Sequence, residues 1–152
     1  MNNFQRVGSK SNAHAGNEFE IIALKYFESL GMFLQRNFPV EFGFNLKKTH
    51  RFDLGGKLGK ETILVECKSH TWTNGNNIPS AKMIIWNEVM LYFSLASNNS
   101  NMILFVLKDY SEKRKLTLAS YYVKIYKHLI PKGVTIMEYD MDLGIANIVY
   151  KS

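Results

Sequence analysis

The chain has 152 residues, of which 46% are hydrophobic and 21% are charged, the composition of one globular domain with a single core. It contains no run of eighteen apolar residues and no signal-peptide-like stretch at residues 1–10, so we expect no membrane segment. One cysteine excludes an internal disulfide, and we expect a cytoplasmic protein.

The charge of the chain is basic, with 19 Lys and Arg against 13 Asp and Glu, a formal net charge of +6. A basic surface suits a polyanionic partner, because neutralising phosphates releases their counterions. Many basic proteins bind no nucleic acid, so the charge alone does not assign DNA as the partner.

The chain begins with a polar stretch, residues 1–12, which predicts a flexible arm. Apolar residues then recur every three or four positions, which predicts a helix from about Ala13 to Leu30 that ends at Gly31. Glu20 lies at the border of this apolar stripe, and Glu18 lies further toward solvent. From the helix pattern alone, Glu20 is a solvated charge.

The next segment, Met32 to Leu46, alternates loosely and contains Pro39 and Gly43, which indicates one long bent strand or two short ones. It leads to a basic patch of Lys47, Lys48, His50 and Arg51 around Thr49. This patch is either a solvated turn or a DNA contact.

A hairpin is predicted over residues 51–68, because Gly59 and Lys60 fit a two-residue turn with glycine first. The register that this turn sets pairs Leu58 with Glu61, Asp53 with Glu66, and Arg51 with Lys68. One face of the hairpin is then apolar and suits a core, with Phe52, Leu54, Ile63, Val65 and Cys67. The other face carries Asp53 beside Glu66, with Lys68 about 7 Å further along the strand.

Like charges directly opposite each other destabilise a sheet, which favours a cation between Asp53 and Glu66. Two oxygen ligands with open positions suit Mg²⁺, and a lysine beside them can orient or deprotonate an attacking water. The pattern therefore indicates a metal-dependent phosphodiesterase site. The alternative is a surface hairpin of mixed charge.

A polar loop follows at residues 69–77, whose amides, hydroxyls and indole suit contacts to bases but also ordinary turns. A helix is then predicted from Pro79 to about Ala96. Its residues leave almost no polar face, so we expect it to be buried on most sides, with Trp86 in the core. Lys82 and Asn87 are the exceptions and point toward the site mouth or solvent.

The last part of the chain predicts a central strand at Met102–Lys108 and a charged loop containing Lys113, Arg114 and Lys115. A helix at Ala119–Ile130 and strands at Val134–Tyr139 and Ile145–Tyr150 complete the order. Residues 1–152 are thus expected to form one α/β domain, a sandwich with a mixed sheet flanked by helices.

The spacing of Asp53 and Glu66-Cys67-Lys68 resembles the PD-(D/E)XK nuclease superfamily. The resemblance covers roughly the first two thirds of the chain through its order of elements, and Phe52 replaces the proline that names the motif. It implies a restriction-endonuclease-like three-layer sandwich with a mixed central sheet.

The resemblance also implies roles for individual residues. In the superfamily the aspartate and glutamate hold one or two Mg²⁺ ions, the lysine assists the nucleophilic water, and a glutamate on the preceding helix often joins the metal site. Those roles fall on Asp53, Glu66, Lys68 and Glu20, with the backbone carbonyl of Cys67 as a further ligand. Mn²⁺ is expected to substitute for Mg²⁺.

These features together predict a Mg²⁺-dependent DNA endonuclease of the restriction or phage type. A repair or Holliday-junction nuclease is the second choice, followed by a non-catalytic DNA-binding domain of the same fold and a protein-interaction domain. A homodimer would cut both strands, although the sequence shows neither the dimer nor a preference for DNA over RNA. The expected nucleic-acid contacts are Lys47, Lys48, Arg51, His70, Asn76 and Lys82, with further charge from Lys113, Arg114 and Lys115.

Overall fold

The computed structural model of the chain describes residues 12–96 and 98–152, so the predicted arm lies outside the described residues except for Asn12. Helix α1 (Asn12–Ser29) comes first. It is followed in order by β1 (Gln35–Phe42), β2 (Lys48–Leu58), β3 (Glu61–Lys68), α2 (Ser80–Leu95), β4 (Ser100–Leu107), β5 (Tyr110–Ser111), β6 (Leu116–Thr117), α3 (Leu118–Tyr126), the 3-10 turn η1 (Lys127–Leu129), β7 (Val134–Asp140) and β8 (Ile145–Lys151).

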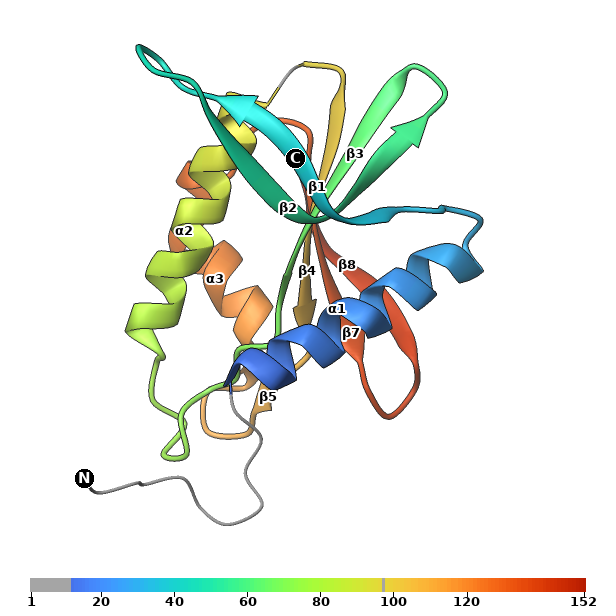
Figure 1. Cartoon of the computed structure of the whole chain (residues 1–152). Coiled ribbons are helices and arrows are strands. Elements are labelled where there is room, and N and C mark those ends of the chain that lie inside the picture. The colour runs from blue at the N-terminus through green and yellow to red at the C-terminus, as the bar shows by residue number, and fades with distance from the viewer. Residues whose placement is uncertain (1–11, 97) are drawn as a thin grey trace, which may run out of the picture.

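The strands form a six-stranded mixed sheet in the order β1-β2-β3-β4-β7-β8, with β5 and β6 as a separate small pair (Figure 1). Strands β3, β4 and β7 are parallel, and the other neighbours are antiparallel. The α/β class and the mixed sheet are therefore confirmed, as is the central position of the apolar strand β4. The predicted loop at 109–115 contains β5, which the sequence did not indicate.

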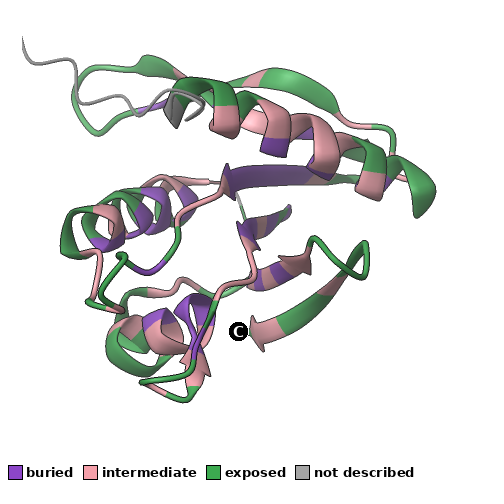
Figure 2. Cartoon of the chain, turned by 90° about the horizontal axis from the view of Figure 1, so that it is seen from below, coloured by how far each residue is buried: buried purple, intermediate pink, exposed green. Residues whose placement is uncertain are grey.

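The helices cover both faces of the sheet, with α1 on one side and α2 and α3 on the other (Figure 2). On the α1 side, Phe19 and Phe27 pack with Leu54, Val65 and Phe105 in one buried cluster. A second cluster on the other side joins α2 and α3 to the sheet; its largest fully buried members include Trp86, Tyr122, Phe52 and Phe93. Within the described ranges, no helix is both long and apolar enough to cross a membrane.

Both long helices have nearly the predicted bounds, and Gly31 ends α1 with the expected positive φ of 82°. The prediction that α2 is buried on most sides is wrong. Ile84 and Leu91 are 66% and 56% exposed, although Trp86 is fully buried as expected. Only one side of α2 packs against the sheet. The apolar composition of the helix therefore did not predict what fraction of its surface is buried.

The β2–β3 hairpin forms with the predicted turn, in which Gly59 has a φ of 64°. Its ladder runs in the predicted register from Leu58–Glu61 to Leu54–Val65 and then stops. The predicted pairs of Asp53 with Glu66 and of Arg51 with Lys68 are therefore not formed as strand pairs.

The strands diverge because β2 exchanges partners along its length, as its bend at the centre of Figure 1 shows. It pairs with β1 from Lys48 to Gly55 and with β3 from Leu54 to Leu58. The prediction that Phe52 shares a face with Leu54 is wrong, because Phe52 joins the cluster under α2 and Leu54 the cluster under α1. The basic patch is not a turn, since residues 48–51 belong to β2.

Candidate active site

Asp53 lies at the point where β2 passes from β1 to β3, and neither ladder includes it. Its side chain takes the place of a strand pair: the backbone N–H of Cys67 donates to Asp53 Oδ2 over 2.7 Å. Cys67 itself points into the core, as predicted, and is 7% exposed. Because β2 and β3 diverge here, Asp53 does not form the predicted cross-strand pair with Glu66. Its carboxylate instead lines a pocket.

Glu66 and Lys68 on β3 complete a compact charged group with Asp53. Lys68 Nζ lies 3.3 Å from Glu66 Oε2 and 4.0 Å from Asp53 Oδ2, between the two carboxylates. Glu66 is only 4% exposed. The sequence thus predicted correctly that these three side chains gather, although the ladder that was expected to align them ends one pair earlier.

His50 is a member of this group that the sequence analysis missed. Its Nε2 lies 3.0 Å from Glu66 Oε1, and its ring stacks on Tyr92 at 3.7 Å between centroids and meets Phe52 edge-on at 4.7 Å. A hydrogen-bonded imidazole between two aromatic rings is held in one orientation. The available signal was the position of His50 on the same strand as Asp53, but only the bend in β2 brings it to Glu66.

The pKa values of the group reflect burial and mutual charge. Burial, and then the charge of Glu66, raises the pKa of Asp53 to about 7. Burial alone would raise the pKa of Glu66 as well, but the hydrogen bond with His50 and the charge of Lys68 outweigh it and lower that pKa. Burial opposes the charge of Lys68, yet Glu66 and Asp53 raise its pKa. Lys68 is therefore an ammonium at neutral pH.

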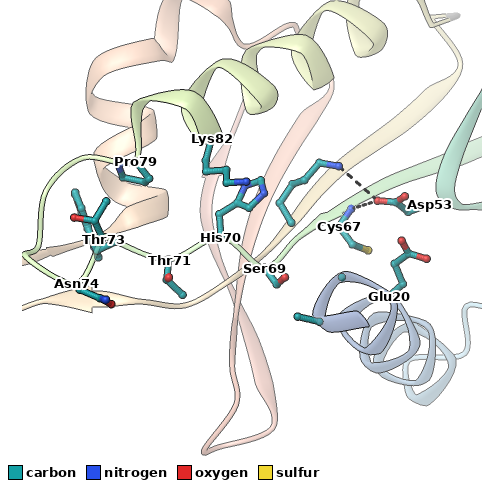
Figure 3. Close-up of a pocket in the computed structure, with 14 residues that line it drawn as sticks. Glu20, Asp53, Cys67, Ser69, His70, Thr71, Thr73, Asn74, Pro79 and Lys82 are labelled. Carbon is teal, nitrogen blue, oxygen red and sulfur yellow. Dashed lines mark hydrogen bonds and ion pairs between the residues drawn. The ribbon is translucent and has the colours of Figure 1, made fainter. Parts of the chain in front are cut away.

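A cavity of about 560 Å³ opens from this group and runs past residues 69–74 to the start of α2 (Figure 3). Glu20 on α1 lines its acidic end with Asp53, and the Glu20 side chain extends toward Asp53. Arg36 Nη2 donates to Glu20 Oε2 over 2.8 Å. Glu18 instead faces His14 at 3.1 Å, so Glu20 is the helix carboxylate that belongs to the cavity.

The part of the cavity beyond Ser69, here called its far end, is lined by His70 and Lys82, two of the predicted nucleic-acid contacts. Trp86 Nε1–H donates to His70 Nδ1 over 2.8 Å. Burial, and then the charges of Lys82 and Lys68, lowers the pKa of His70 to about 4. The imidazole is therefore neutral at physiological pH.

The loop that forms the cavity wall is anchored at Trp72, which is 6% exposed. Its backbone N–H and its indole N–H both donate to Asp109, over 2.8 and 3.0 Å. The Arg114 guanidinium lies 5.3 Å from the Trp72 ring centre, and Arg114 Nε donates to the carbonyl of Asn76 over 2.8 Å. The Trp72 indole is therefore not available to bases, which leaves the ordinary-turn alternative for this part of the loop, and Arg114 has a structural role.

The other predicted nucleic-acid contacts do not line the cavity. Lys47, Lys48 and Arg51 are exposed, and Arg51 Nη1 donates to the carbonyl of Asn37 over 3.3 Å. Asn76 is held through its backbone beside Arg114. Two more residues of the predicted set are exposed on the loop that carries β5, namely Lys113 and Lys115.

The acidic end fits a small divalent cation, although it does not gather every predicted ligand. Within residues 12–96 and 98–152, no three His, Cys, Asp or Glu side chains stand close enough to hold a metal, so Glu20 does not join Asp53 and Glu66 in such a set. Mg²⁺ needs only one or two carboxylates, because it keeps several waters. Asp53 and Glu66 supply two adjacent carboxylates, and the Lys68 ammonium lies between them, so a bound metal ion would have to displace Lys68 Nζ.

Comparisons of the chain with protein-family models, with curated proteins and with solved structures found no match in any of the three.

Proposed function

We propose that the protein is a Mg²⁺-dependent endonuclease that hydrolyses phosphodiester bonds in DNA. One observation carries the proposal: Asp53 and Glu66 lie together with Lys68 Nζ between them, 4.0 Å from Asp53 Oδ2 and 3.3 Å from Glu66 Oε2, and Asp53 and Lys68 line the end of an open cavity. A surface hairpin of mixed charge would leave the burial of both carboxylates unexplained.

Asp53, Glu66 and the backbone carbonyl of Cys67 would hold the metal. When bound, Mg²⁺ stabilises negative charge on the phosphoryl oxygens and the leaving oxygen. In the hydrolysis a water oxygen bonds to phosphorus, the bond from phosphorus to the leaving oxygen breaks, the water loses a proton and the leaving oxygen gains one.

Lys68 is suited to orienting that water and the phosphate rather than to removing a proton. The two carboxylates raise its pKa, so its nitrogen is fully protonated at neutral pH and can only donate. A fixed ammonium beside the reacting phosphate stabilises the charge that develops there.

The order of the elements supports the same proposal. A helix, three antiparallel-connected strands, a helix and a parallel strand follow one another. This is the order that the PD-(D/E)XK resemblance implies, and Asp53 and Glu66 lie on its second and third strands. We therefore propose the restriction-endonuclease-like sandwich as the specific fold.

The test is digestion of closed circular DNA with and without Mg²⁺, using wild type and Asp53→Asn. We expect nicked or linear DNA only with Mg²⁺, and a loss on the order of 10³-fold in the variant, because metal charge stabilisation is worth several kcal/mol. Asp142→Asn is the matched control, since Asp142 is exposed on the β7–β8 turn.

The same proteins allow a measurement without turnover. Mg²⁺ or Mn²⁺ should raise the melting temperature of wild type and of Asp142→Asn, but not of Asp53→Asn, because an ion that binds only the folded state stabilises it. Equal responses in all three proteins would contradict the metal site. Cleavage of branched but not linear DNA would indicate the junction-nuclease alternative, and binding without cleavage the non-catalytic one.

A further inference from the structure

The far end of the cavity gathers hydrogen-bond donors without acidic partners. His70 and Lys82 line it together, and Lys82 in the first turn of α2 is half-buried. No carboxylate among residues 12–96 and 98–152 pairs with the Lys82 ammonium. The segment between Lys68 and Lys82 contains no Asp or Glu, so the cavity carries its carboxylates only at the opposite end.

The orientation of the His70 proton is fixed by the core. An indole N–H can only donate, so the 2.8 Å contact from Trp86 makes His70 Nδ1 an acceptor and places the ring proton on Nε2. Trp86 is fully buried and packs on Tyr122 at 5.1 Å between ring centres. Nε2–H has no protein acceptor in the part of the chain that the structure describes.

The wall that carries His70 is also held in place. The hydrogen bonds from Trp72 to Asp109 and from Arg114 to Asn76 tie the loop after β3 to the loop that carries β5. A donor on an anchored loop loses little freedom when a ligand binds, which favours affinity. Figure 3 shows His70 and Lys82 side by side, beyond Ser69 from the acidic end.

We infer that His70 Nε2–H and the Lys82 ammonium form a second phosphate-binding subsite, which holds an internal phosphodiester of the strand whose neighbouring phosphate lies at Asp53 and Lys68. This inference rests on the proposed nucleic-acid substrate. A neutral N–H and an ammonium both donate to phosphate oxygens, and the charge of the ammonium favours an anionic ligand over an uncharged one. Only Ser69 separates Lys68 from His70, and both line the same cavity, so a strand bound there would meet the two groups one after the other.

The two residues should contribute to binding in different ways. Binding would be measured in Ca²⁺, so that the DNA stays uncut. Lys82→Met should lower the affinity for DNA and reduce the slope of log affinity against log salt by about 0.9, the value for one phosphate contact on duplex DNA. His70→Asn keeps an oxygen acceptor for Trp86 but removes the Nε2 donor. It should weaken binding roughly tenfold and leave the slope unchanged, because a neutral group displaces no counterion.

Lys60→Met is the matched control, because Lys60 is an exposed lysine in the β2–β3 turn, at the opposite end of β3 from the cavity. It should change neither the affinity nor the slope by a comparable amount. Melting temperatures measured on all variants separate a loss of binding from a loss of folding.

Closed circular DNA and linear DNA with phosphorylated ends distinguish the two sources of phosphate. The expected effects should appear on closed circles, which have no terminal phosphate. Effects confined to phosphorylated ends would overturn an internal subsite, as would a wild-type slope in Lys82→Met or wild-type affinity in His70→Asn. If the slopes of log affinity against log salt are as expected but no DNA is cleaved in Mg²⁺, the proposed endonuclease activity is overturned and the phosphate subsite remains supported. Absence of DNA binding by the folded wild type would overturn both.

Discussion

The two ends of the cavity differ in how their polar groups are partnered. At the acidic end, Asp53, Glu66 and Lys68 contact one another, and His50 Nε2 forms a hydrogen bond with Glu66 Oε1, the carboxylate oxygen that Lys68 does not contact. At the far end, His70 Nε2–H and the Lys82 ammonium have no partner in residues 12–96 and 98–152. The carboxylates of the first end suit the proposed cation, whereas the unpaired donors of the second end suit an anionic ligand. Substitutions at the first end should therefore change turnover, and those at the second should change binding.

Among the substitutions that compare the two ends of the cavity, Lys68→Met is expected to have the largest effect on the cleavage rate. Cleavage should fall on the order of 10²-fold, the range for loss of one positioned group in the transition state, while the melting-temperature response to Mg²⁺ persists. Rates from single-turnover digestion would measure it. Lys68→Arg keeps the positive charge but places it with a different geometry. Cleavage at the wild-type rate in both variants would show that Lys68 is only an ion-pair partner of Glu66.

His50→Phe should have the next largest effect. It keeps an aromatic ring to pack between Tyr92 and Phe52 but leaves Glu66 Oε1 without its donor. Removing a residue that orients a metal ligand typically lowers the metal affinity or the activity 10–100-fold. A titration of Mn²⁺ against melting temperature would measure the affinity. Tyr92→Phe keeps the stacked ring and serves as the control, which should bind the ion like wild type.

The dependence of stability on pH should also distinguish the acidic end. In the metal-free protein, burial and Glu66 raise the pKa of Asp53 from 3.8 to about 7, so the folded state binds more protons than the unfolded state between these values. The contribution of Asp53 to the free energy of unfolding should then fall as pH rises from about 4 to about 7, by at most about 1.4 kcal/mol per pH unit. The lowered pKa of Glu66 acts in the opposite sense at acid pH.

Urea denaturation of wild type and Asp53→Asn across this range would isolate the contribution of Asp53. Wild type should lose stability relative to the variant as pH rises, and the difference should level off above about pH 7. A difference that stays constant throughout would mean that the carboxyl is ionised in both states.

The smallest effect should come from the loop that walls the cavity. Arg114→Met loses the hydrogen bond to Asn76 and the contact with the Trp72 ring, which should cost about 1 kcal/mol and lower the melting temperature by about 2–4 °C. Lys113→Met, at an exposed neighbour, should leave the melting temperature unchanged. A larger loss of DNA affinity in Lys113→Met than in Arg114→Met would show that this loop lies on the DNA.

Local features of the sequence were sufficient for the element order, for the two long helices and for the β2–β3 turn. Gly31 and Gly59 adopt the positive φ that their predicted places require. The turn alone fixed the register as far as Leu54 and Val65, because each strand pair follows from the one before it. Asp53, Glu66 and Lys68 could therefore be placed near one another before any tertiary contact was known.

The partners of the site residues depended on the tertiary structure. Strict alternation assumes that a strand keeps one partner, whereas β2 exchanges β1 for β3 around Asp53, which moves Phe52 to the other face and brings His50 to Glu66. The bond between Trp86 and His70 and that between Trp72 and Asp109 join segments 16 and 37 residues apart. The sequence by itself brought Asp53, Glu66 and Lys68 near one another, and long-range packing decided which other groups they meet, because no local periodicity encodes contacts between separate elements.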